Sequence, residues 1–80
     1  MTLRERILFQ VSEASGGIKF TELVAKLVSE NYSDKIDYIR DMEPENIENI
    51  CEDLALEGTL GILRYTNRAY MREKMFIYTP

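Results

Sequence analysis

The stretch that decides the fold covers residues 43–80 and reads EPENIENICEDLALEGTLGILRYTNRAYMREKMFIYTP. Pro44 suits the first position of a helix, where its missing N–H group is not needed. Gly58 can adopt a left-handed conformation and end that helix. Between them, apolar residues recur at the spacing i, i+3, i+4, i+7, which predicts one buried helical stripe. These residues are Ile47, Ile50, Cys51 and Leu54.

Two short runs of branched and aromatic residues follow this helix, at residues 60–65 and 75–78. Such runs are typical of β-strands. The segment at residues 64–74 is polar and basic and contains two tyrosines, and we expect it to form the loop of a β-hairpin. This half of the chain is therefore predicted to run in the order helix, glycine, strand, basic loop, strand.

The N-terminal part predicts a first helix. Thr2, followed three residues later by Glu5, is a capping-box pair, so the helix should begin almost at once. Gly16 and Gly17 should end it, and Phe9 should point away from its inner face. That inner face is formed by Leu3, Ile7, Leu8, Val11 and Ala14.

A short strand and a second helix should follow. Residues 18–20 alternate in polarity, which predicts a strand, and Thr21 can cap the helix after it. The connection at residues 30–43 is longer than most helix-to-helix connections. Ser33 could cap a short extra helix there, and a prolonged second helix is the competing interpretation. The inner stripe of the second helix is Leu23, Val24, Leu27 and Val28.

Length and charge place limits on the class of protein. Eighty residues predict one domain, residues 1–80, which buries ~60–65% of the surface that its unfolded chain exposes. The net charge of −4 is unevenly distributed: residues 28–57 carry ten acidic and two basic side chains, whereas residues 58–80 carry four basic and one acidic. If these blocks occupy different faces they create an electrical dipole, which bears on binding partners.

The composition argues against catalysis. The chain has no histidine and a single cysteine, Cys51, so it lacks the usual general base and the ligand sets of zinc sites. We therefore expect no catalytic residue, no metal, no cofactor and no enzymatic activity. A lone cysteine cannot form an internal disulfide, and no run of residues is long enough to cross a bilayer. We predict a soluble, cytoplasmic protein without a membrane partner.

The order helix, short strand, helix, helix, two-stranded hairpin resembles the winged helix-turn-helix superfamily. This resemblance implies an α+β fold with a small three-helix core and a C-terminal β-hairpin wing; residues 30–43 leave room for one extra short helix between helices two and three. It also implies DNA binding and transcription regulation, through the third helix and the wing. The residues that carry the resemblance are Leu3, Ile7, Leu8 and Val11, the segment 17–23, and Ile47, Ile50, Cys51, Leu54, Glu57, Gly58, Thr59 and Leu60.

The third helix departs from this pattern because its outer face is acidic. Affinity for nucleic acid comes largely from neutralising phosphate charge, so carboxylates without a neighbouring cation repel it. We therefore expect the basic wing to lead nucleic-acid binding, although a solvated hairpin is an equal alternative. The predicted nucleic-acid-binding residues are Arg64, Tyr65, Asn67, Arg68, Tyr70, Arg72 and Lys74.

The alternative function is a protein–protein interaction module that uses the acidic face of the third helix. Its partner would be another protein or a second copy in a homodimer, and a DNA-mimic inhibitor is a sharper form of this hypothesis. Both interpretations assume that the wing and the acidic helix present opposite charges on separate surfaces. The predicted protein-interaction residues are Phe9, Glu45, Glu48, Asn49, Glu52 and Leu56.

Overall fold

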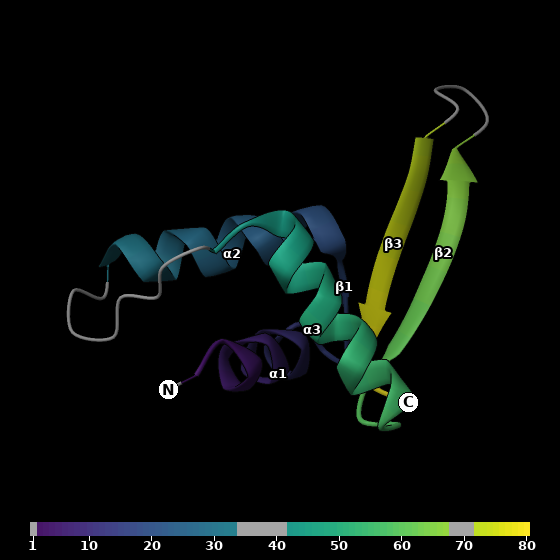
Figure 1. Ribbon diagram of the computed structural model, residues 1–80, viewed down its shortest axis with the longest axis horizontal. Coiled ribbons are helices and arrows are strands. Elements are labelled where there is room, and N and C mark those ends of the chain that lie inside the picture. The colour runs from purple at the N-terminus through teal and green to yellow at the C-terminus, as the bar shows by residue number, and fades with distance from the viewer. Residues whose placement is uncertain (1, 34–41, 68–71) are drawn as a thin grey trace.

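The computed structural model describes residues 2–33, 42–67 and 72–80. Within these residues the chain is a small α+β domain of three helices and a three-stranded antiparallel sheet (Figure 1). This confirms the α+β class and the expected element order. The elements are α1 (Leu3–Glu13), β1 (Gly17–Lys19), α2 (Phe20–Ser33), α3 (Pro44–Leu56), β2 (Gly61–Asn67) and β3 (Arg72–Tyr78).

The helix ends follow local signals in the sequence. The Thr2 hydroxyl accepts a hydrogen bond from the Glu5 backbone N–H at 3.2 Å, as the capping pair predicts, and α3 begins at Pro44. Gly58 has a φ of 82°, a left-handed conformation that suits glycine, and ends α3 as expected. The Thr59 N–H then donates to the Leu54 carbonyl at 3.0 Å, which satisfies a carbonyl at the end of the helix.

Both boundaries of α2 differ from expectation. α2 begins at Phe20, so Thr21 lies in its first turn and is not the residue that precedes it. α2 also continues to Ser33, which is helical itself and does not start a separate helix. The rest of the predicted extra helix falls in residues 34–41, outside the described residues.

The sheet has the strand order β1-β3-β2, so the strand that comes last in the sequence lies in the middle. Ile77 of β3 pairs with Ile18 of β1 on one side and with Ile62 of β2 on the other. Ile77 is fully buried, and Ile18 is almost so. The face of the sheet that carries these three isoleucines therefore covers the hydrophobic core.

The core combines this sheet face with one stripe from each helix. The buried stripe of α3 is the predicted one, with Ile50 only partly buried. Burial, together with the nearby carboxylates of Glu48 and Glu52, raises the pKa of the Cys51 thiol to about 12, so the thiol is inert at neutral pH. The fully buried side chains are Ile7, Val11, Leu23, Leu27, Ile47, Cys51, Leu54 and Ile77.

The β-hairpin is longer than predicted. Its strands extend through Asn67, Arg72 and Lys74, which were expected in the loop, and through Arg64 and Tyr65, where the predicted strand and the predicted loop overlapped. Continuous cross-strand pairing explains this, because the register runs without a break to the last pair, Asn67 with Arg72. β1 pairs with residues 76–78 of β3, and beyond these pairs β2 and β3 continue as a two-stranded ribbon (Figure 1).

Candidate functional site

The two faces of the sheet carry different side chains because successive residues of a strand point to opposite sides. Residues paired across an antiparallel sheet share a face, so the register assigns each position. We call the face that carries Ile77 the inner face and the opposite face the outer face. The inner face carries Ile18, Ile62, Arg64, Met75 and Ile77, and the outer face carries Lys19, Leu63, Tyr65, Lys74, Phe76 and Tyr78.

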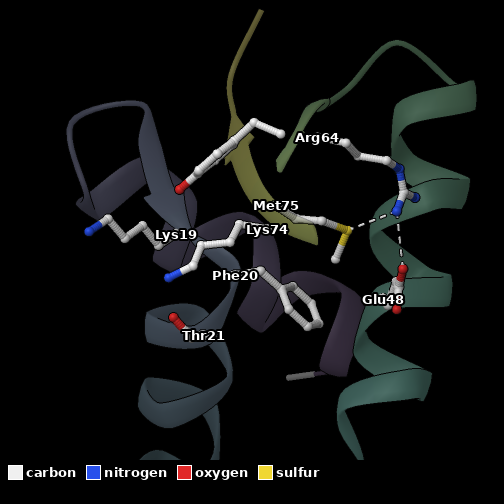
Figure 2. Close-up of a pocket in the computed structure, with 8 residues that line it drawn as sticks. Lys19, Phe20, Thr21, Glu48, Arg64, Lys74 and Met75 are labelled. Atoms are coloured by element: carbon white, nitrogen blue, oxygen red, sulfur yellow. Dashed lines mark hydrogen bonds and ion pairs between the residues drawn. The ribbon is translucent and has the colours of Figure 1, made fainter. Parts of the chain in front are cut away.

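Arg64 lies on the inner face and binds the side of α3. Its guanidinium Nη1 lies 3.3 Å from Glu48 Oε1, and its Nη2 lies 2.5 Å from Glu52 Oε1. Nη1 also donates to the sulfur of Met75 at 3.1 Å. Figure 2 shows the Arg64 side chain reaching from the sheet towards Glu48 and Met75. Arg64 is therefore one half of a bridge between the hairpin and α3.

This bridge corrects the expectation that the basic hairpin and the acidic helix are separate. Arg64, a predicted nucleic-acid contact, is neutralised by Glu48 and Glu52, which were predicted to face a protein partner. The reason is the position of α3, which brings these two carboxylates beside β2. Positive and negative side chains therefore meet where β2 packs beside α3, and the acidic surface left on α3 is smaller than the sequence predicts.

The outer face combines cations with apolar rings. Tyr65 is paired with Lys74, and Phe76 is paired with Leu63 on one side and with Lys19 on the other. Leu63, Tyr65 and Tyr78 are 55%, 40% and 37% exposed, and both lysines are exposed. No carboxylate occurs among the side chains that the structure describes on this face.

Two glycines let aromatic rings lie along the outer face. A Cβ atom at Gly17 would lie 2.4 Å from Cζ of Phe76, and one at Gly61 would lie 2.3 Å from Cζ of Tyr78. Both distances are far below a van der Waals contact, so the ring tips occupy the space that side chains would fill at these positions. The rings therefore rest on the backbone of the neighbouring strands.

β1 ends at Lys19, and from there the edge of β3 has no strand partner on that side. A cavity of about 490 Å³ opens at this point. Phe20 and Thr21, at the start of α2, form part of its wall. In Figure 2 the Lys19 and Lys74 ammonium groups lie on one side of the strands, and the Arg64 guanidinium lies on the other. The lining residues are Lys19, Phe20, Thr21, Glu48, Arg64, Tyr65, Lys74 and Met75.

The remaining predicted protein-interaction residues lie on two different helices. Glu45, Asn49 and Leu56 are exposed on α3, Leu56 at 88%, while Phe9 is 49% exposed on α1. Next to Leu56, the Glu57 carboxylate pairs with Arg4 of α1 at 2.5 Å, a hydrogen bond that holds the pKa of Glu57 below its usual value.

The other predicted wing residues are only partly placed. The backbones of Asn67 and Arg72 pair at the far end of the described strands. Arg68 and Tyr70 fall outside the described residues. The roles assigned to all these residues stay predictions.

Sequence reasoning missed four residues of the outer face, namely Lys19, Leu63, Phe76 and Tyr78. One signal could have found the two aromatic residues: Ile77 is the most apolar residue at the centre of its strand, so its neighbours Phe76 and Tyr78 must point away from the core. Lys19 could not be found in this way, because its place next to Phe76 depends on a pairing between strands that are far apart in the chain.

Within residues 2–33, 42–67 and 72–80 no three acidic or cysteine side chains are grouped so as to hold a metal ion, and none of the helices is long and apolar enough to cross a membrane. No protein-family model matches the chain, and neither a curated protein nor a solved structure matches it.

Proposed function

We propose that the protein is a non-enzymatic nucleic-acid-binding regulator of the winged-helix type, which contacts its target with the sheet and not with α3. The arrangement of three helices and a C-terminal β-hairpin is compatible with a winged helix. The charges decide which part of such a domain can approach a polyanion.

α3 is unsuited to a DNA groove. Residues 44–57 contain five acidic side chains and no basic one. Duplex DNA carries one negative charge per ~1.7 Å of its axis, so a helix of this composition is repelled. Arg64, the hairpin cation that bonds to α3, is engaged by Glu48 and Glu52.

The outer face of the sheet carries the proposal. Lys19 and Lys74 are exposed there, and no carboxylate is described beside them on that face. Glu48 of α3 lines the same cavity as the two lysines, but it is paired with Arg64 on the inner face, so phosphate groups can approach the lysines from the outer side of the sheet. Tyr65, opposite Lys74, adds a ring that can contact a sugar or a base.

The test is a titration of fluorescently labelled single-stranded and duplex DNA, read by anisotropy at about 50 and 200 mM salt, the range over which phosphate contacts are most evident. Lys19→Glu and Lys74→Glu should each weaken binding and reduce the slope of log K against log salt by about 0.7–0.9. Lys26→Glu is the matched control, because Lys26 is an exposed lysine on α2 that belongs neither to the sheet nor to the cavity lining. Equal losses in all three variants, or no binding at about 100 μM protein, the weak end of non-specific affinity, would refute the proposal.

A second candidate function is protein interaction through α3, and the exposure of Leu56 favours it. Leu56 is 88% exposed, and a partner that buries its side chain stabilises the complex by ~1.5–3 kcal/mol. A second copy of the chain is the simplest partner. Light scattering of the native protein and of Leu56→Ser tests it: a dimer that the substitution dissociates supports this function, and a monomer at all concentrations excludes the homodimer.

A further inference from the structure

We infer that the outer face of the sheet is a stacking platform for the bases of single-stranded nucleic acid. This inference rests on the proposed function and adds the kind of strand and the way in which it is bound. Three aromatic residues (Tyr65, Phe76 and Tyr78) and two lysines (Lys19 and Lys74) carry it, all on one face. We call this set the platform.

The platform has the geometry that base stacking requires. Because Gly17 and Gly61 lack side chains, the rings of Phe76 and Tyr78 rest on the neighbouring strands. Each of these rings has one side against backbone; Tyr78 is 37% exposed, and Phe76 is half-buried. Tyr65 adds a third ring, 40% exposed, two strand positions beyond Leu63. Stacking on such rings tolerates any sequence, since every base has a π-face.

The two lysines are placed to hold the backbone of the bound strand. Lys19 lies beside Phe76 on the β1 side, and Lys74 lies beside Tyr65. Residues directly opposite in a sheet have Cβ atoms about 4.5–5.5 Å apart, so each ammonium group can reach a phosphate next to a stacked base. Each ring of these two pairs therefore has a cation next to it.

This arrangement favours a single strand over a duplex. The bases of a duplex are stacked on each other and present only their edges in the grooves, so the rings of the platform would have nothing to stack on. An unpaired strand turns its base faces outwards. Because stacking does not involve the sugar, DNA and RNA strands of the same sequence should bind alike.

The charges disfavour a second copy of the chain on the platform. Two identical outer faces packed together would bring the Lys19 and Lys74 side chains of both copies into one interface. No carboxylate is described on this face to pair with them, and like charges placed together at an interface are costly. An unpaired nucleic-acid strand carries phosphates that complement the two lysines and base rings that complement the aromatic side chains.

The experiment compares an oligo(dT) of about 15 nucleotides, its RNA counterpart and a duplex of the same length, a size that covers known single-strand sites. The chain contains no tryptophan, so tyrosine emission can be followed without interference. Single strands should bind more tightly than the duplex and quench this emission as bases stack.

Three variants separate stacking from charge. Tyr65→Leu keeps an apolar strand residue and should weaken single-strand binding by ~5- to 150-fold, the range found when a stacking ring is removed. Tyr65→Phe keeps the ring and should recover most of that loss. Phe9→Leu is the matched control, since it removes an exposed ring from α1, and it should leave affinity unchanged. Circular dichroism of each variant verifies that it is folded.

The outcomes separate the two proposals. If the duplex binds at least as tightly as the single strand, or if Tyr65→Leu has no effect while Lys74→Glu weakens binding, the platform is refuted and nucleic-acid binding stands. If no nucleic acid binds, both are refuted. A self-association that Tyr65→Leu abolishes would also refute the platform, because a second copy would then be its occupant.

Discussion

The bridge from Arg64 to Glu48 and Glu52 should stabilise the contact between the hairpin and α3, and Arg64→Met tests its strength. The three side chains are 35–46% exposed, so solvent screens each ion pair, and exposed pairs contribute about 0.2–1 kcal/mol. Removing both pairs costs about 0.4–2 kcal/mol. Glu48 and Glu52 are then left one helical turn apart without their cation, which adds about 0.2–0.5 kcal/mol. For 80 residues, 1 kcal/mol corresponds to a shift in melting temperature of about 6 °C.

The assay is a double-mutant cycle of Arg64→Met, Glu52→Gln and both together, measured by urea unfolding. The coupling energy should be about 0.2–1 kcal/mol at low salt. It should shrink at 1 M salt, where the Debye length is ~3 Å. Glu48→Gln with Glu52→Gln should raise nucleic-acid affinity, because these changes remove two negative charges beside the hairpin.

Two results would refute this reasoning. Arg64→Met as stable as the native protein, with no coupling to Glu52→Gln, would show that the bridge contributes nothing. A loss of nucleic-acid affinity in Arg64→Met as large as in Lys74→Glu would show that Arg64 contacts the ligand in spite of its carboxylate partners. Arg64 would then belong to the binding site as the sequence predicted.

Three further predictions concern the helical part. Burial raises the pKa of the Cys51 thiol from 9.0 to about 12, so between these pH values the folded state keeps a proton that the unfolded state loses. The free energy of unfolding, measured by urea unfolding, should therefore fall as the pH rises from about 9 towards 12. In Cys51→Ala this contribution to the fall should be missing. Gly58→Ala should cost about 1–2 kcal/mol in a thermal melt, because alanine is strained at a φ of 82° although its Cβ has free space, and Gly58→Asn, which tolerates this conformation better, should cost less. Leu56→Ser should leave the melting temperature within about 3 °C, because the side chain is almost wholly exposed and surface substitutions usually change stability by less than 0.5 kcal/mol; a larger fall would show that Leu56 packs in the folded state.

The helices could be predicted because their signals are local. Thr2, Pro44 and Gly58 act within one turn of the residues that they cap, and the stripe that contains Leu54 needs only the periodicity of a helix. The start of α2 was missed by two residues because the chain passes from β1 directly into the helix at Phe20, after the pairing of Lys19 with Phe76.

The candidate site could be predicted only in part because charges were assigned to segments of sequence and not to faces. Arg64 and Tyr65 are neighbours in the chain, yet one binds α3 and the other lies on the outer face. Strand alternation separates them, and the hairpin extends far enough for this alternation to apply. The pairing of Arg64 with Glu52 depends on how α3 packs against β2, which no local pattern encodes.

The central place of β3 has a consequence for how the protein is made. Ile18 is synthesised early, but its partner Ile77 follows almost sixty residues later. The helices can form while the chain is still growing on the ribosome, whereas the sheet must wait until residues 76–78 have emerged. Ile18 and Ile62 remain uncovered until then. A chain truncated before residue 76 would therefore keep β1 and part of the hairpin but lack the strand segment that joins them, and Ile18 and Ile62 would have no partner.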